Sequence, residues 1–261
     1  MTRLTRDGIA SARRIVVKVG SSSISGANVG QIAPLVDALA AAHERGAEVM
    51  LVSSGAIATG MPYLQLDARP DDLATQQAAA SVGQNILIFR YQESLRRYRI
   101  VAGQVLLTAG DLENPTHRLN AQRAMERLLG LRILPIVNEN DTVATHEIRF
   151  GDNDRLAALV AELTGADLLV LLSDVDALYT RPPHVEGAER IAHVPYGDEL
   201  AGVEIGSVGR AGVGTGGAET KVSAARIAAA SGTGVLVTAT SLVAEALAGA
   251  PIGTWFEPAD D

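Results

Sequence analysis

The sequence predicts an α/β protein, a three-layer α/β/α sandwich around a mainly parallel, open sheet. Six short apolar runs lack the apolar–polar alternation of half-exposed strands, which is typical of strands buried on both faces of a parallel sheet. Helical patterns separate these runs. No Pro/Ser-rich linker divides the chain, so we expect one domain over residues 1–261. The 47% hydrophobic content is sufficient for a core of that size.

The six expected strands are β-branched or leucine-rich. In chain order they are Ile15–Val17, Val49–Val52, Gln104–Leu107, Ile133–Val137, Leu168–Leu172 and Gly234–Val237. A hairpin of Thr142–Ala144 and Glu147–Phe150 is expected to interrupt the alternation. The segment Thr180–Gly212 contains Pro and Gly and is acidic, so we expect a long irregular excursion from the sheet.

The expected helices are amphipathic or alanine-rich. They cover residues 31–45, 71–98, 116–129, 153–163, 219–230 and 241–248. The first has apolar residues at helical spacing and is followed by Gly46, a typical C-cap. The second is long and rich in alanine and glutamine, and a break is expected near Gly83.

Composition excludes several classes of function. The net charge of -8 argues against a general binder of nucleic acid or of a membrane surface. The absence of cysteine excludes disulfides, thiolate metal sites and thiol nucleophiles. Residues 1–14 lack the apolar core of a secretory signal, and no apolar run is long enough to span a bilayer. We therefore expect a cytoplasmic protein that binds anions through a few placed cations.

Lysine use points to those cations. Of the 22 basic residues only Lys18 and Lys221 are lysine, and both lie in glycine-rich stretches. A compact ammonium group can lie against a transferring phosphoryl group, whereas the guanidinium fork is broader. The alternative is that two lysines remain by chance in an arginine-rich chain.

Polar residues follow one expected strand after another, at the sheet edge where ligands of α/β proteins bind. These stretches are Lys18–Ser22, Ser53–Ala56, Asn138–Asp141 with 151–154, Ser173–Asp176 and Gly214–Lys221. Glycine and small hydroxyl residues let backbone N–H groups approach phosphate oxygens. Taken singly, a glycine-rich turn is often only a turn, and residues 152–154 could simply cap a helix. Neither the P-loop nor the dinucleotide fingerprint is present.

Seven motifs in this order resemble the amino-acid kinase family over residues 14–256. They occupy residues 17–22, 52–57, 77–84, 103–108, 137–145, 148–154 and 214–217. Within the family the similarity is to enzymes that phosphorylate the side-chain carboxylate of L-glutamate with MgATP, as the first step of proline biosynthesis. The resemblance implies an amino-acid-binding N-terminal part, a nucleotide-binding C-terminal part and a homo-oligomer, either a dimer or a tetramer. The C-terminal PUA domain of many relatives is expected to be absent.

The resemblance also implies roles for particular residues. Lys18 would stabilise the transferring phosphoryl group, Lys221 the nucleotide phosphates, and Asp154 would orient both ammonium groups. The implied substrate-binding residues are Ser54, Asn138, Asp141, Asp152 and Asn153. The implied ATP-binding residues are Lys18, Gly20, Ser173, Asp174, Thr215, Gly216, Gly217, Ala218, Glu219, Thr220 and Lys221. Mg²⁺ would be held largely by ATP oxygens, so no protein metal ligand is expected.

Some positions depart from the family pattern. Ala218 and Glu219 stand where Gly-Met and a small residue are usual, and Ala177 replaces a usual glycine. Two alternatives to glutamate phosphorylation therefore stay open. One is a specialised paralogue that phosphorylates another amino acid or acidic metabolite, and the other is a catalytically weak ligand-sensing protein on the same scaffold.

Overall fold

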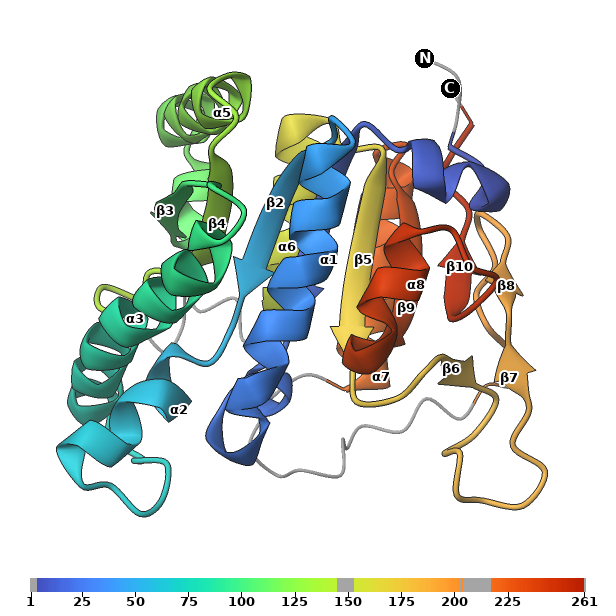
Figure 1. Cartoon of the computed structure of the whole chain (residues 1–261). Helices are drawn as coiled ribbons and strands as arrows, with labels where there is room; N and C mark the ends of the chain where they lie inside the picture. The colour runs from blue at the N-terminus through green and yellow to red at the C-terminus, as the bar shows by residue number, and fades with distance from the viewer. Residues whose placement is uncertain (1–3, 145–152, 202, 204–216, 261) are drawn as a thin grey trace.

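The computed structural model describes residues 4–144, 153–201, 203 and 217–260, and its centre is an eight-stranded sheet (Figure 1). The strand order is β3-β4-β2-β1-β5-β9-β10-β8. Six strands are parallel: β1 (Arg14–Val19), β2 (Glu48–Ser53), β3 (Ala102–Leu107), β4 (Leu134–Glu139), β5 (Leu168–Ser173) and β9 (Gly234–Ala239). The expected mainly parallel sheet and its six strands are confirmed.

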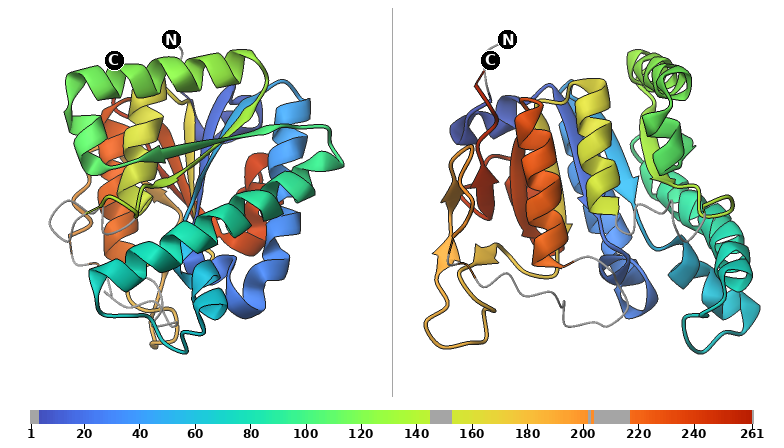
Figure 2. Two further views of the ribbon diagram at one scale, coloured as in Figure 1. Left: turned by 90° about the vertical axis from the view of Figure 1, so that its left-hand side faces the viewer. Right: turned by 180° about the vertical axis from the view of Figure 1, so that it is seen from behind.

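Helices cover both faces of this sheet, which confirms the three-layer sandwich (Figures 1 and 2). One face carries α1 (Ile32–Glu44), α3 (Leu73–Arg96) and α8 (Val243–Leu247). The other carries α5 (Pro115–Gly130), α6 (Asn153–Thr164) and α7 (Ala218–Ala230). The shorter helical segments are η1 (Arg6–Ser11), η2 (Ser21–Ser23), η3 (Gly26–Gln31), α2 (Ala56–Gly60), η4 (Met61–Leu64), α4 (Ala109–Glu113) and η5 (Thr240–Leu242). No helix in the described part of the chain is long and apolar enough to cross a membrane.

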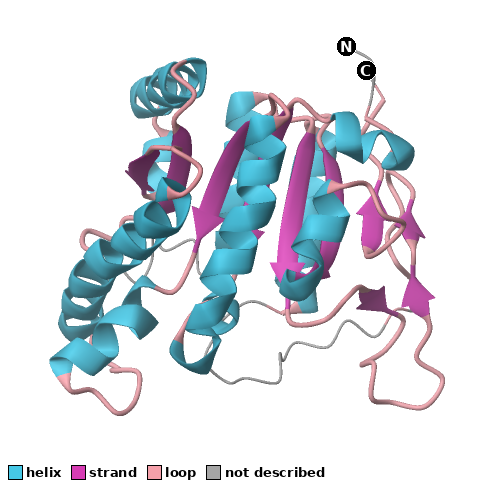
Figure 3. Cartoon of the chain, viewed as in Figure 1, coloured by secondary structure: helices cyan, strands magenta, loops and turns pink. Residues whose placement is uncertain are grey.

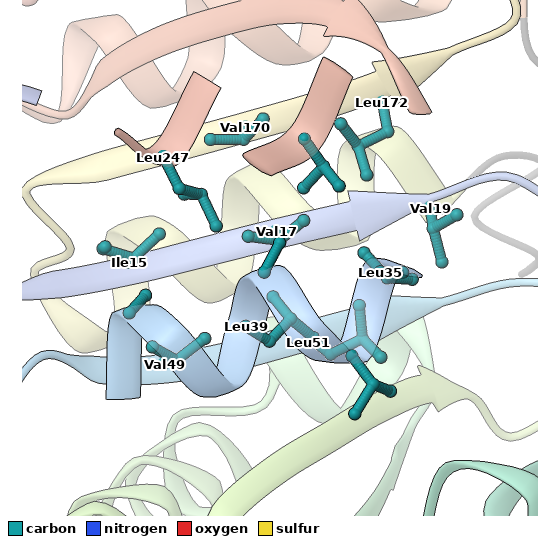
Figure 4. Packing of buried hydrophobic residues seen from close by; sticks show 14 of the residues in the cluster. Ile15, Val17, Val19, Leu35, Leu39, Val49, Leu51, Val170, Leu172 and Leu247 are labelled. Atoms are coloured by element: carbon teal, nitrogen blue, oxygen red, sulfur yellow. The ribbon is translucent and has the colours of Figure 1, made fainter. Parts of the chain in front are cut away.

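Alternate side chains of the central strands separate the core into two clusters. On β1, Ile15 and Val17 point to the face of α1 and α8, whereas Val16 packs with α6 and α7. Figure 4 shows the first cluster, in which Leu35 and Leu39 of α1 lie over the strands. Because both faces of each central strand are buried, its sequence is a continuous apolar run.

Helix α1 ends as expected. Gly46 follows the last turn with a φ of 100°, a left-handed conformation that glycine adopts without a steric penalty. The Gly46 N–H donates to the carbonyl of His43 at 3.0 Å, which satisfies one of the last free carbonyl groups of the helix.

The expected break in α3 near Gly83 is wrong, because the helix runs unbroken from Leu73 to Arg96. A Cβ atom at Gly83 would lie 1.8 Å from the carbonyl oxygen of Ala56 in α2. In the same way, a Cβ atom at Gly60 would lie 1.9 Å from the carbonyl oxygen of Ala79. These two glycines let the backbones of α2 and α3 touch, so Gly83 serves close packing and not a bend.

The expected hairpin is wrong in its described half. Instead of a strand, residues 141–143 form a turn, and the N–H groups of Val143 and Ala144 donate to the carbonyl of Asn140 at 3.2 and 3.1 Å. The other half, Glu147–Phe150, lies outside the described residues.

The expected irregular excursion after Thr180 contains more structure than predicted (Figure 3). β7 (Arg190–Ile191) pairs antiparallel with β6 (Leu178–Tyr179). β8 (His193–Val194) joins the main sheet beside β10 (Thr254–Phe256), which runs antiparallel to β9. These strands of two or three residues are too short to produce a periodic pattern in the sequence.

Candidate functional site

The parallel register brings the carboxyl ends of four strands to one edge of the sheet. Val19 of β1 lies beside Ser53 of β2, and the Ser54 N–H donates to the Val19 carbonyl at 3.2 Å. β4 flanks β2 and β5 flanks β1, in the same direction. In Figure 1 the arrowheads of β2 and β5 point to this edge, where α7 also begins.

Two buried lysines meet one buried aspartate at this edge. The Nζ atom of Lys18, from β1, lies 2.5 Å from Oδ1 of Asp154 in the first turn of α6. The Nζ atom of Lys221, from the first turn of α7, lies 3.2 Å from Oδ2 of the same carboxylate. Asp154 is 0% exposed, Lys18 2% and Lys221 6%. The structure thus joins residues that are 203 positions apart in the sequence.

This triad has formal charges of +2 from the lysines and −1 from the aspartate, a sum of +1. Burying charge is costly unless opposite charges and hydrogen bonds compensate it. Here one carboxylate serves two ammonium groups, and Thr220 Oγ1 lies 3.1 Å from its Oδ2 atom. An anion placed beside the triad would meet two ammonium groups in a desolvated setting.

The start of α7 adds to this positive potential. Gly217 is the N-cap of this 13-residue helix, and as a glycine it has no side chain to cap the first turn. Free N–H groups and the helix dipole favour an anion at such a terminus. Thr220 Oγ1 also lies 2.9 Å from the Gly217 carbonyl, so its single proton serves either this oxygen or Asp154. Glu219 is exposed in the same turn.

A second group at the edge is neutral and consists of amides and hydroxyls. The Asn153 amide nitrogen lies 2.8 Å from the Ser53 carbonyl, 3.0 Å from Ser54 Oγ and 2.8 Å from Asn138 Oδ1. Its two N–H bonds must serve three acceptors. Asn138 donates its own amide N–H to Gln84 Oε1 at 2.7 Å. A continuous network thereby links α3, β4, α6 and the end of β2.

Sequence reasoning assigned no individual role to three members of this network: Gln84, Ser53 and Tyr91. The Tyr91 hydroxyl and Ser53 Oγ are 2.9 Å apart, and both residues are 0% exposed. Burial raises the pKa of Tyr91, although the hydrogen bond with Ser53 opposes this shift, so the phenol is neutral. The available signal was the position of Gln84 and Tyr91 on one face of a helix, three residues before and four after the buried Leu87.

The remaining expected residues are distributed along the same edge. Gly20 directly follows β1, and a Cβ atom there would lie 4.0 Å from Lys18 Nζ. Asp141 is half-buried beyond β4. Ser173, at the end of β5, donates to the exposed Asp174 at 3.2 Å. Three expected residues lie outside the described part of the chain, namely Asp152, Thr215 and Gly216.

Ala177, which departs from the usual glycine, needs no special backbone conformation. It is 1% exposed, and it is not among the non-glycine residues with positive φ in the described structure. An alanine therefore fits this turn without steric strain.

Metal ligation by the triad is disfavoured. Both Asp154 oxygens already lie within 3.2 Å of an ammonium group. In the described part of the chain, no three His, Cys, Asp or Glu side chains gather in a way that could hold a metal ion.

Comparison with known proteins agrees with this geometry. The model of the amino acid kinase family matches residues 13–239. The chain is 80% identical to a glutamate 5-kinase of Clavibacter sepedonicus over 99% of both chains. It is 77% identical to a glutamate 5-kinase of Leifsonia xyli subsp. xyli, over 100% of this chain and 97% of that protein.

The fold has solved relatives as well. A carbamate kinase from Giardia lamblia bound to AMP-PNP superimposes with a TM-score of 0.68, covering 96% of this chain and 100% of that one. At 15% identity this likeness supports the fold alone. The family model covers most of the chain, and the two glutamate 5-kinases match over 97% or more of both chains. The chain therefore belongs to the amino acid kinase family.

Proposed function

We propose that this protein transfers the γ-phosphoryl group of MgATP to the side-chain carboxylate of L-glutamate, giving L-glutamyl 5-phosphate and ADP in the first step of proline biosynthesis. The observation that carries the proposal is the buried Lys18–Asp154–Lys221 triad beside a neutral amide network. The names of relatives at 80% and 77% identity support glutamate as the substrate.

The reaction asks for positioning and charge compensation and not for a general base. A side-chain carboxylate has an ordinary pKa of about 4.3, so it is ionised at neutral pH. Its oxygen attacks the γ-phosphorus while the bond to the β,γ-bridging oxygen breaks, and the electron pair leaves with ADP. No proton moves. Two anions must approach each other, and cations placed between them lower that barrier.

The triad suits this task in a divided way. Lys18, on a central strand, would stabilise the phosphoryl group in transit, and Lys221, on α7, would hold the nucleotide phosphates. Asp154 would orient both ammonium groups, because one of its oxygens faces each lysine. Rigid placement on a strand and two helices favours a preorganised site.

The amide network and its neighbours would bind the amino acid. Asp141 carries the charge that suits an α-ammonium group, and Ser54 and Asn153 can donate to carboxylates. Asn138 holds the Asn153 amide in place at 2.8 Å. The family resemblance implies a substrate-binding role for Asp152 as well. Ser54 and Asn153 are neutral donors, so they can bind glutamate without neutralising the carboxylate that attacks the phosphorus.

Nucleotide binding would use the other end of the edge. Gly20 follows β1, Ser173 ends β5 and Asp174 follows it, and Gly217 precedes α7, whose first turn contains residues 218–221. By resemblance, Thr215 and Gly216 would also contact the nucleotide. Mg²⁺ would enter with ATP, coordinated mainly by phosphate oxygens, and it would neutralise charge on the β- and γ-phosphates. The N-terminal part of the chain would thus hold the amino acid and the C-terminal part the nucleotide.

A homo-oligomer and a cytoplasmic location complete the proposal. Helix α3 exposes Phe89 to 63%, and Val101 just before the edge strand β3 is 56% exposed. Exposed apolar side chains beside an open sheet edge are a suitable surface for a second copy of the chain. ATP and free glutamate are available in the cytoplasm, where a protein without cysteine is at no disadvantage.

One experiment separates the proposal from its alternatives. ADP release is measured for the purified chain with a panel of amino acids and other acids, and the acyl phosphate is trapped with hydroxylamine. We expect ADP and a hydroxamate that both depend on glutamate. Signal only with another acid would support a specialised paralogue, and no signal with any acid would support a ligand-sensing protein.

A further inference from the structure

A cavity of about 500 Å³ lies outside the kinase site, between the N-terminal turn η1 and the β8–β10 edge of the sheet. Figure 1 shows η1 near the top of this edge, whereas the strands β2 and β5 point to the opposite, lower end. No residue of the triad or the amide network lines it. Its volume lies within the range of small-molecule sites, about 300–1,000 Å³.

Two guanidinium groups, from Arg6 and Arg190, give the cavity its character. Arg6 Nη2 donates to the carbonyls of Ala250 and Ile252, and Arg190 Nη2 donates to the Gly253 carbonyl at 2.8 Å. These bonds fix both side chains along the loop before β10. Both guanidinium groups are therefore held in place before any ligand arrives.

The Nη1 atom of Arg6 is a buried donor that has no acceptor within the described part of the chain. A buried N–H group of a charged side chain without an acceptor is costly. Burial lowers the pKa of Arg6, and the like charge of Arg190 lowers it further, against the influence of Asp7. Both arginines line the same cavity, so an anion bound there would offset the repulsion between their like charges.

Within the described residues, neither acidic side chain of the wall forms an ion pair with Arg6 or Arg190, although Asp7 partly offsets the charge of Arg6. Glu257 lies 3.1 Å from Nε2 of His193, on the β8 side. Asp7 lies on η1 next to Arg6 and is exposed to solvent. The rest of the wall is largely apolar and includes Trp255, which is 3% exposed. The expected ligand therefore has an anionic head between the two arginines and an apolar body beside the indole of Trp255.

We infer that this cavity is a second binding site, for a small anion whose carboxylate or phosphate head is held by Arg6 and Arg190. Guanidinium groups bind both kinds of oxyanion through paired N–H donors. The inference concerns binding alone, so it stands or falls independently of the phosphoryl transfer proposed above.

Trp255 provides the readout, because it is the one tryptophan of the sequence and it lines the cavity. The full chain is titrated with inorganic phosphate and, separately, with succinate at constant ionic strength, with chloride as the reference anion. We expect a saturable change in tryptophan emission. Saturation with phosphate alone assigns a phosphate head, and saturation with succinate assigns a carboxylate head.

Variants decide whether the cavity is responsible. Arg6→Gln and Arg190→Gln should each weaken the apparent affinity on the order of tenfold or more, as expected for loss of a charge-assisted hydrogen bond. Arg96→Gln is the matched control, because the Arg96 side chain is 76% exposed and pairs with Glu93 on the surface of α3, away from the cavity. If Arg6→Gln does not fold, Arg190→Gln carries the test. Emission that does not saturate, or that saturates equally in both cavity variants, overturns the inference.

Discussion

Two neighbouring residues on α6 belong to opposite kinds of chemistry. Asp154 is the centre of a buried charge cluster, whereas Asn153 is the centre of a neutral hydrogen-bond network. The cluster collects cations from β1 and α7, and the network collects amides and hydroxyls from β2, β4 and α3. The edge of one sheet therefore divides into a charged half that suits phosphoryl transfer and a neutral half that suits amino-acid binding.

This comparison teaches that the two halves should fail differently. Loss of a charge in the cluster leaves other buried charges uncompensated and removes stabilisation of the transition state. Loss of an amide in the network leaves neutral groups unpaired and mislocates the substrate. The first kind of change should act on stability and turnover, and the second mainly on the KM for glutamate.

The largest difference is expected between substitutions of the two adjacent residues on α6. Asp154→Ala leaves two buried lysines without their shared carboxylate, so unfolding should become easier by about 3–5 kcal/mol. Asn153→Ala removes neutral hydrogen bonds and should cost about 1–3 kcal/mol. Urea denaturation of both variants gives the comparison. Equal losses would mean that the charge cluster is no more costly to disturb than the network.

Removal of either lysine is expected to act on turnover. Lys18→Ala and Lys221→Ala should each lower kcat by about 10²–10³, the usual effect of removing one preorganised electrostatic donor. Steady-state assays of ADP release check this, with Arg96→Ala as a surface-cation control. A variant that keeps kcat within about threefold of the parent would remove that lysine from the chemistry.

The close packing of α2 against α3, the helix that carries Gln84 of the network, is expected to be sensitive to one added methyl group. Gly83→Ala forces a Cβ atom against the Ala56 carbonyl, so overpacking should cost about 1–3 kcal/mol. Gly130→Ala in α5 is the control, because a Cβ atom there meets nothing within 4 Å. Thermal unfolding of both variants measures the contrast, and a neutral Gly83→Ala would show that α2 and α3 need no backbone contact.

The smallest expected effect concerns Gln84, which reaches the site only through Asn138. Gln84→Ala should raise the KM for glutamate about tenfold and change kcat by less than about threefold, as for loss of one buried neutral hydrogen bond. Gln92→Ala is the control on the same helix, since Gln92 bonds to the backbone of Ile100 and Ala102 instead. A fall in kcat with unchanged KM would place Gln84 with the charge cluster.

The sequence predicted the elements whose pattern is contained in neighbouring residues. Leu168–Leu172 is apolar throughout because β5 is buried on both faces, and Gly46 marks the end of α1 because only its left-handed φ suits that position. The strands β8 and β10 could not be predicted, since two or three residues carry no period. Gly83 was misinterpreted because glycine occurs both where two helices pack closely and where a helix bends.

The candidate site also contains residues that the sequence could predict and residues that it could not. Lys18 and Lys221 were visible because lysine is rare in this chain, and the structure brings both to Asp154. Gln84 was missed as a site residue because its partner Asn138 is 54 positions away, and the contact exists only after α3 packs beside β4. Long-range pairing of this kind leaves no local pattern.

The most direct test of the whole account is the turnover of Lys18→Arg and Lys221→Arg with ATP and glutamate. These variants keep the charge and replace only the shape of the cation. If two compact ammonium groups act on one phosphoryl group, both kcat values should fall close to those of the alanine variants. Near-native turnover of either arginine variant would contradict the account, because charge alone would then suffice.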